Sequence, residues 1–235
     1  TLYAPNNMAF ARFLMESGFS TIDDVPLDIL KKVLLNHVMV DIIRYRDFET
    51  GYYKSAAQYI NGDSMTNLSI HIEQVNMRVT LNGESRITQG NVDASNGIIH
   101  AVDKIIPIPS IVTFAKADKN LGNLLLALTR SDLTTDFPSI LSTNVGTAPA
   151  PFTVFAPTDQ AFIDLLVELG VQSLGDIDEP TLKATLTYHV IGETNAYSTD
   201  LSDNLELNTL GGPITANITG GATLTDGNNR VSNIV

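Results

Sequence analysis

The sequence contains no cysteine and no tryptophan in its 235 residues. Without cysteine the chain has no disulfide, no thiolate ligand for a metal and no cysteine nucleophile. Apolar runs are also short, since the longest ones, such as residues 105–109 and 124–128, fall far below the ~20 residues that cross a bilayer. These absences exclude disulfide scaffolds, cysteine enzymes and a membrane-spanning segment within this stretch. A composition that is 43% apolar still predicts a packed core.

Basic residues are scarce in the second half of the chain. Residues 1–109 carry 12 acidic and 9 basic side chains, whereas residues 110–235 carry 14 acidic and 5 basic ones, for a net charge of −12. Between Ser131 and Asn229 the single lysine or arginine is Lys183. Such a surface repels phosphate backbones, so nucleic acid is excluded as a partner.

A sequence motif near the start of the chain is repeated much later. "TLYAPNNMAF" occupies residues 1–10 and "TVFAPTDQAF" occupies residues 153–162, and residues 1–38 align with 153–190 without gaps at 14 identical positions of 38. Chance gives about two or three, so the sequence has an internal repeat. The identical residues are mostly apolar or turn-forming, which indicates a shared fold more than a shared active site.

Each copy of the repeat predicts a strand-to-helix corner. A short strand ends at the Ala-Pro pairs that contain Pro5 and Pro157, because proline lacks an N–H and disfavours helical geometry in the residue before it. An amphipathic helix should follow, capped by Asn6 in the first copy and by Thr158 in the second, and it should end at Gly18 and Gly170. We therefore expect the two prolines to be structural.

A second helix is predicted over residues 27–38 and again over 180–190. In the first copy, the spacing predicts an inner apolar stripe of Leu27, Leu30 and Leu34. Beyond it the pattern alternates, as in residues 75–81, and Asn82-Gly83 signals a hairpin turn. Each unit thus has helices first and then a mostly antiparallel sheet, which is an α+β plan. The two prolines in "PIP" mark a boundary near Pro109.

Three motifs in a fixed order point to a family: "TVFAPTDQAF", "TLTYHVIG" at residues 185–192 and "NGIIHAVDKIIPIP" at residues 96–109. Together they resemble the fasciclin-type adhesion domain, and the resemblance covers nearly the whole chain. It implies a helical cap packed on a twisted, antiparallel, β-sandwich-like sheet. It also implies that both copies are incomplete: residues 1–109 lack N-terminal helices, and residues 110–235 lack a closing C-terminal strand. We accordingly expect the sequence to be a fragment.

In animal members of this family, a Tyr-His region is implicated in integrin recognition. Tyr188 and His189 match it by resemblance, whereas the first copy has Asn36 in place of the tyrosine. A histidine at a helix end can also bond the nearby backbone, and we expect His37 to have that structural role.

A second integrin-linked pair in animal relatives is Asp-Ile. The aligned pairs here are Asn91-Val92 and Asn233-Ile234. Losing the carboxylate removes a ligand for an integrin's metal ion, which argues against an integrin partner. Another cell-surface or matrix protein, or a polysaccharide, remains the expected partner, and all four residues stay candidates for adhesion.

No catalytic pattern accompanies the repeat. The sequence offers no nucleophile beside a base, no His-x-x-x-His spacing and no calcium loop. We therefore expect no enzyme, cofactor or metal site, and a hydrolase is the weakest of three functional hypotheses.

The segment 45–59 is rich in tyrosine and supports an alternative function. Tyr45, Tyr52 and Tyr53 are candidate glycan contacts, because tyrosine combines a large apolar area with a polar tip. This alternative is a module that binds a small ligand or a polysaccharide. Two sequons, at Asn67 and Asn217, would accept N-glycans in a host that glycosylates secreted proteins.

The preferred hypothesis is a secreted or cell-surface adhesion protein made of tandem domains, with a signal or anchor expected upstream of residue 1. It would work by presenting surfaces to a partner and not by turning over a substrate.

Overall fold

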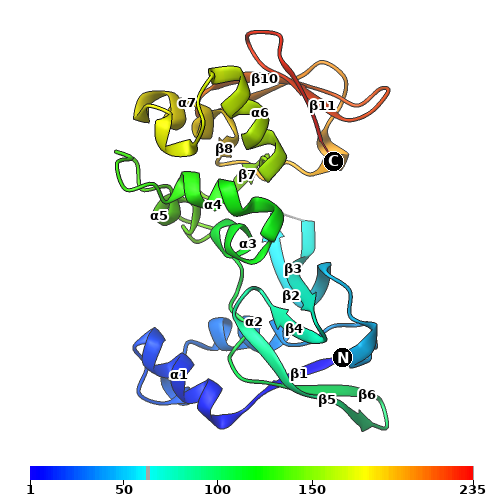
Figure 1. Cartoon of the computed structure of the whole chain (residues 1–235). Coiled ribbons are helices and arrows are strands. Elements are labelled where there is room, and N and C mark those ends of the chain that lie inside the picture. Colours follow the sequence, from blue (N-terminus) through cyan, green and yellow to red (C-terminus); the bar gives the residue numbers. More distant parts are fainter. Residues whose placement is uncertain (62–63, 235) are drawn as a thin grey trace. The chain divides into compact units, whose positions relative to one another are not determined.

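A computed structural model describes residues 1–61 and 64–234. The chain divides into two compact units. Unit 1 consists of Thr1–Pro109 and Lys116–Asp118, and unit 2 of Ser110–Ala115 and Lys119–Val235. Figure 1 shows the helices and strands of both. Each unit is described by itself below.

Unit 1 combines two helices with one sheet. Its elements are β1 Leu2–Pro5, α1 Asn7–Ser17, α2 Leu27–Asn36, β2 Gly51–Asn61, β3 Ser64–Val75, β4 Arg78–Leu81, β5 Ser85–Ala94 and β6 Gly97–Val102, with 3-10 turns at Ile22–Asp24 and Tyr45–Asp47. The strand order is β1-β6-β5-β4-β3-β2. Neighbouring strands are antiparallel except for β1 and β6, which run parallel in a register that pairs Leu2 with Ile99 and Pro5 with Val102.

The core of unit 1 lies against one face of this sheet. Alternate residues of the strands point into it, so that Ile70, Ile72, Val79 and Leu81 are all buried. Burying each such side chain contributes about 1.5–3 kcal/mol. The alternation predicted for residues 75–81 holds only in part, because a reversal at Asn76 and Met77, both with positive φ, lets Val75 pair with Arg78 across the turn.

The helices of unit 1 begin and end as their sequences predict. Asn6 caps α1 by accepting a hydrogen bond from the backbone of Ala9 at 2.9 Å, and Gly18 ends it in the left-handed conformation. The predicted inner stripe of α2 is wrong, however, since Leu27 is 80% exposed and Leu34 is 46% exposed. The buried side of α2 is instead formed by Val33 and Asn36.

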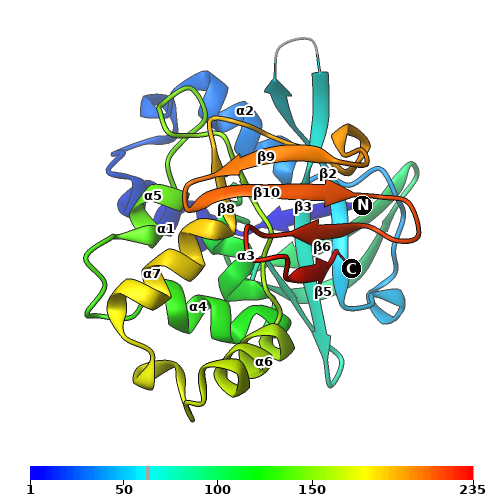
Figure 2. The same ribbon diagram turned by 90° about the horizontal axis from the view of Figure 1, so that it is seen from above.

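Unit 2 is built mainly around helices. Its elements are α3 Ile111–Ala117, whose last two residues are assigned to unit 1, α4 Gly122–Leu128, α5 Phe137–Leu141, β7 Phe152–Val154, α6 Asp159–Leu169, α7 Glu179–Tyr188, β8 Val190–Gly192, β9 Leu205–Thr209, β10 Gly212–Asn217, β11 Thr223–Thr225 and β12 Val231–Asn233, with 3-10 turns at Lys119–Leu121, Leu174–Asp176 and Ser198–Asp200. Strands β9 to β12 form an antiparallel sheet in the order β12-β11-β10-β9, and β7 pairs with β8 separately. Figure 2 shows β9 and β10 lengthwise, side by side.

One apolar cluster joins the helices of unit 2. Phe162, Leu182 and Leu186 from α6 and α7 pack with side chains of the preceding helices, including Leu124 and Phe137. Residues 111–141 therefore cover the same side of the helix pair that unit 1 leaves exposed on α1 and α2. Helices followed by largely antiparallel strands in both units confirm the α+β class.

Candidate functional site

Helix α7 carries the Tyr-His motif at its C-terminal end. The helix starts after Asp178, whose carboxylate accepts a hydrogen bond from the backbone of Thr181 at 3.0 Å. Leu182 and Leu186 are fully buried and fix one side of the helix on the core. The motif at residues 188 and 189 is therefore held on a rigid element rather than on a loop.

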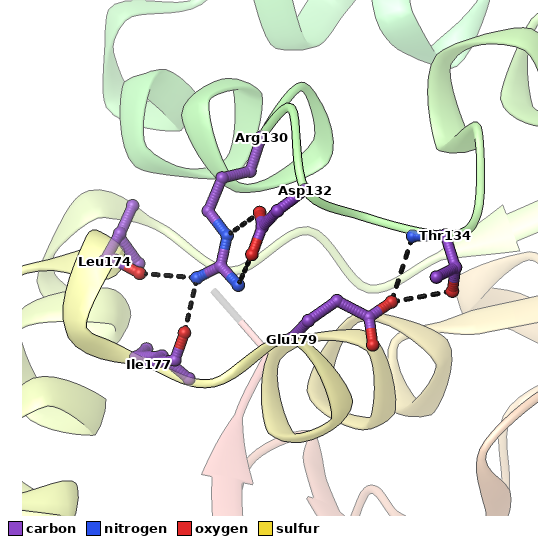
Figure 3. Close-up of polar contacts among 6 residues, drawn as sticks. All are labelled: Arg130, Asp132, Thr134, Leu174, Ile177 and Glu179. Atoms are coloured by element: carbon purple, nitrogen blue, oxygen red, sulfur yellow. Dashed lines mark hydrogen bonds and ion pairs between the residues drawn. The ribbon is translucent and has the colours of Figure 1, made fainter.

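An arginine fastens the loop that precedes α7 (Figure 3). Nη1 of Arg130 donates to the carbonyl oxygens of Leu174 and Ile177, both at 2.7 Å, while Nε and Nη2 donate to the Asp132 carboxylate at 2.6 and 2.9 Å. The hydrogen bond from Arg130 lowers the pKa of Asp132. Such a forked, charge-assisted pair fixes the guanidinium plane, and its remaining donors then fix the backbone of the loop.

The first turn of α7 has a second attachment, also visible in Figure 3. The backbone nitrogen and Oγ1 of Thr134 donate to Glu179 Oε1 at 3.0 and 2.7 Å, and Lys183 Nζ donates to Thr134 Oγ1 at 3.1 Å. The backbone hydrogen bond from Thr134 is the main cause of a lowered pKa at Glu179. A carboxylate in the first turn also suits the helix dipole.

Two open depressions flank Arg130. The larger has a volume of about 600 Å³ and the smaller about 330 Å³. Leu126, Leu166 and Leu174 give the larger one an apolar floor, and Asn123 and Gln172 contribute polar groups. Both are open to solvent, which fits a contact surface better than an enclosed small-molecule pocket.

Tyr188 lies beneath a hairpin. A Cβ atom on Gly211 would stand 2.6 Å from Cδ2 of Tyr188, and one on Gly212 would stand 2.7 Å from its Oη, so only glycine allows this approach. Beside these glycines, the tip residue Leu210 is 54% exposed and donates its backbone N–H to Val190 at 2.8 Å. The tyrosine therefore supports the β9–β10 turn, and the turn presents Leu210.

The two repeat histidines have the same bond at the end of their helices. Nδ1 of His189 lies 2.8 Å from the carbonyl oxygen of Thr185, and Nδ1 of His37 lies 2.8 Å from that of Val33. Nε2 of His37 also accepts from the backbone N–H of Ile106 at 2.9 Å, which places the ring proton on Nδ1. Burial lowers the pKa of both rings, although the backbone bond raises it in part.

The Asn-Val pair of unit 1 is part of an irregular strand. Asn91 has a φ of 61° at a shift in the pairing of β5 with β6, a conformation that asparagine tolerates. Its Oδ1 accepts from the backbone of Tyr45 at 2.8 Å, and its own N–H donates to Nδ1 of His100 at 3.2 Å. Val92 beside it is 39% exposed.

The corresponding pair in unit 2 lies at the end of the four-stranded sheet. Asn233 pairs with Thr223 in β11, and the backbone N–H of Ile234 donates to Ala222 at 2.8 Å. Asn91 and Val92 belong to unit 1, whereas Asn233 and Ile234 share unit 2 with Tyr188. The six candidate adhesion residues therefore do not form one site within a unit.

The three candidate glycan-contact tyrosines do not form one surface. Tyr52 and Tyr53 are neighbours on β2 and so point to opposite faces of the sheet. Tyr45 and Tyr53 pack against the buried core of unit 1, with the Tyr45 hydroxyl donating to the carbonyl of Met77 at 2.6 Å. Tyr52 is half exposed, and its hydroxyl donates to Asp118 at 2.9 Å.

The two sequons differ in what their amide nitrogens do. Nδ2 of Asn67, the atom that carries a glycan, donates to the carbonyl oxygen of Ser55 within the β2–β3 pair. Asn217 ends β10 and uses its Oδ1 to accept from Asn204 at 3.0 Å. A glycan on Asn67 would therefore interfere with a sheet bond, whereas one on Asn217 would leave its Oδ1 bond possible.

Both predicted structural prolines lie at strand-to-helix corners. Pro5 is the last residue of β1 and pairs with Val102. Pro157 directly precedes Thr158, whose hydroxyl caps α6 by accepting from Ala161. The repeat's Ala-Pro phrase thus marks the same corner twice.

Sequence reasoning missed Arg130 and the contact of Gly211 with Tyr188. The sequence did contain a signal for Arg130, because this residue is one of very few cations in the acidic second half of the chain and follows the end of an apolar pattern typical of a helix. Gly211 could be predicted as a turn residue but not as the partner of Tyr188. Within residues 1–61 and 64–234, no three His, Asp or Glu side chains gather as metal ligands, and no described helix is long and apolar enough to cross a bilayer.

Known proteins resemble this chain along most of its length. The fasciclin domain family matches residues 1–109 and 119–235. Stabilin-2 of Rattus norvegicus is 29% identical over 144 residues, which are 57% of this chain and 10% of stabilin-2. Human (Homo sapiens) periostin is 25% identical over 193 residues, which are 81% of this chain and 21% of periostin.

A solved pair of FAS1 domains, from the insect cell adhesion molecule Fasciclin I, aligns with 95% of this chain and 78% of its own at 15% identity and a TM-score of 0.49. The chain spans far less than two thirds of stabilin-2 or periostin. Because the family match includes both halves of the sequence, the chain belongs to the fasciclin domain family.

Proposed function

We propose that this chain is part of a secreted or cell-surface adhesion protein, which binds a matrix or cell-surface protein or a polysaccharide and catalyses no reaction. The observation that carries the proposal is the match of one domain family to both halves of the chain. A tandem arrangement lets two weak contacts act together and so raises overall affinity.

The domain boundaries are part of the proposal. We propose residues 1–109 as one domain and residues 110–235 as the other. Exposed Leu34 supports this assignment, because its counterpart Leu186 is buried under the helices of residues 111–141.

The contact surface that we propose is the β9–β10 turn of unit 2. Its tip, Leu210, is exposed, while Tyr188 lies behind it against Gly211 and Gly212. An exposed apolar side chain on a supported turn gains contact area on binding without a large loss of conformational entropy. The Tyr-His motif would then act as the support of this surface.

A solid-phase attachment assay tests the function. The chain is offered to immobilised matrix proteins, glycans and cells, and attachment to at least one is expected. Leu210→Asp should weaken that attachment by roughly tenfold or more. Ile163→Asp is the matched control, because Ile163 is also exposed in unit 2 but lies on α6 and lines neither depression. No attachment to any surface would contradict adhesion, and equal loss in both variants would contradict the assignment to the turn.

The proposed partner is not an integrin. Asn91 and Asn233 stand where animal relatives have an acid, and an amide does not replace a carboxylate on a metal ion.

The small-ligand alternative loses support, since Tyr45 and Tyr53 pack inward and leave Tyr52 as the exposed ring of the three.

A further inference from the structure

The larger depression beside Arg130 is a groove between two helices and a loop of unit 2. Its lining comes from α4, from α6 and from residues 172–175, the loop that Arg130 fastens. The floor of three leucines is apolar, and the volume of about 600 Å³ lies in the range of roughly 300–1,000 Å³ that accepts a drug-sized ligand. Leu126 on this floor is 61% exposed. Covering it with another apolar side chain therefore removes apolar surface from water, which is favourable.

Three carboxylates border this groove, because each accepts hydrogen bonds from one of its lining residues. The bonds measure between 2.6 and 2.9 Å, and the pairs are Asp132 with Arg130, Asp159 with the backbone of Asn123, and Asp176 with Ser173. The three acids belong to separate segments, which are the loop after α4, the first turn of α6 and the 3-10 turn before α7. Each acid thus lies one hydrogen bond from the groove.

Arg130 is the charged residue of the described lining, but it does not offset these acids for a ligand. Its donors bond Asp132 and two backbone carbonyls (Figure 3). The Arg130 side chain is 15% exposed, whereas that of Asp132 is 57% exposed. A ligand in the groove therefore meets the carboxylate more than the guanidinium, and three carboxylates stand against this one cation.

We infer that this groove is a binding site for a cationic, apolar peptide segment of another protein, a short run of leucine-like side chains flanked by lysine or arginine. The apolar side chains cover the leucine floor, and the flanking bases pair with the bordering carboxylates. The side-chain amides of Asn123 and Gln172 each hold a donor and an acceptor, which suits the C=O and N–H groups of a peptide. The site is separate from the proposed adhesive turn, because Leu210 is not part of the described lining.

The same observations disfavour other classes of ligand. The bordering carboxylates repel an acidic polysaccharide or a phosphate backbone. A neutral glycan binds by stacking its sugar rings on aromatic side chains, and the described lining contains no aromatic residue. A peptide that carries both apolar and basic side chains satisfies the floor and the border together.

Peptide titration followed by NMR tests the site. The probe is the acetylated and amidated peptide Lys-Leu-Gly-Leu-Lys, added to the full chain while the backbone amide shifts are recorded. Shifts should concentrate at lining residues such as Ser173 and Gly175, and binding should weaken as salt is added, because salt screens exposed charge pairs. Versions with glutamate for both lysines, or with serine for both leucines, should not shift these amides. Equal shifts with any of these peptides, or no shift at the groove with the first one, would overturn the inference.

Two variants separate the groove from the overall charge of the chain. Leu126→Lys places a base on the floor and should weaken binding of the lysine peptide by roughly tenfold or more. Ile163→Lys is the matched control, since it makes the same change of charge at an exposed side chain that lines neither depression, and it should bind nearly as well as the unchanged chain. Equal loss in both variants would contradict the site.

A neutral oligosaccharide, cellotetraose, provides the last comparison. It should leave the amides of the groove unshifted, whereas shifts with cellotetraose and none with the peptide would overturn the inference in favour of a glycan site. The outcome is independent of the attachment assay, because Leu210 lies outside the described lining.

Discussion

Nε2 of His37 accepts a hydrogen bond from the backbone nitrogen of Ile106 at 2.9 Å, across 69 residues of sequence. The same ring bonds Val33 through Nδ1. One buried side chain thus joins the end of α2 to the segment that follows β6. In unit 2, His189 has the helix bond to Thr185, but among the described residues no backbone N–H donates to its Nε2 as Ile106 does to His37.

His37→Ala should therefore lower the free energy of unfolding of its unit more than His189→Ala does in the other unit. Removing His37 leaves a buried N–H at Ile106 without its acceptor, which costs about 1–3 kcal/mol. Urea unfolding followed by NMR signals of each unit measures the two effects. An equal loss in both variants would contradict the role assigned to the Ile106 bond.

Leu34 and Leu186 are identical positions of the repeat with opposite burial. Leu186→Ala should cost about 2–5 kcal/mol, since it opens a cavity in the cluster of unit 2. Leu34→Ala should cost less than about 1 kcal/mol, because Leu34 is 46% exposed. Thermal unfolding of the two variants compares them. A large loss from Leu34→Ala would show that its side chain is covered after all.

Gly211→Ala should disrupt the support of the β9–β10 turn. The new methyl would meet both the ring and the backbone nitrogen of Tyr188, within 2.6 and 2.7 Å, and overpacking of this kind costs about 1–3 kcal/mol. Gly175→Ala is the control in the same unit, since its Cβ would meet nothing closer than Ser173 Oγ at 3.5 Å. Differential scanning fluorimetry should separate the two variants, and identical midpoints would contradict the packing described.

Stability should fall as the pH drops below about 6.5. Burial lowers the pKa of His37, His71, His100 and His189 from an ordinary value of 6.5. Below the unfolded pKa, these histidines bind more protons in the unfolded chain than in the folded chain, so the free energy of unfolding decreases as the pH falls. The contribution is fully present above that pH.

Urea midpoints measured between about pH 7.5 and 5 test this sign. His37→Asn removes one titrating group and should flatten the slope. A midpoint that rises on acidification over this range would contradict the histidine assignment.

Much of the local structure follows from sequence. The Asn6 and Thr158 caps, the Gly18 and Gly170 ends and the α+β class all depend on residues within a few positions, and the structure has them as predicted. The prediction of the inner stripe of α2 was wrong because apolar spacing shows that a helix has an apolar face, but it does not show which element covers that face. Leu34 and Leu186 have the same spacing and differ only in their tertiary neighbours.

The candidate site was predicted less well than the fold. The Tyr-His motif was found, but the packing of Tyr188 against Gly211 depends on a contact between residues 23 positions apart. The tyrosine-rich segment 45–59 does not by itself reveal which rings face outward, because adjacent strand residues such as Tyr52 and Tyr53 face opposite sides of the sheet. Arg130 acts through carbonyl groups of Leu174 and Ile177, which no side-chain pattern reveals.

The central claim is that Tyr188 supports the surface that Leu210 presents. Attachment of Tyr188→Phe and Leu210→Asp to the same immobilised partner tests it most directly. Tyr188→Phe keeps the ring against Gly211 and removes only the hydroxyl, so attachment should stay close to that of the unchanged chain. Leu210→Asp should lose roughly tenfold or more. Loss of attachment in Tyr188→Phe with full attachment in Leu210→Asp would show that the tyrosine itself is the contact, and would contradict the account.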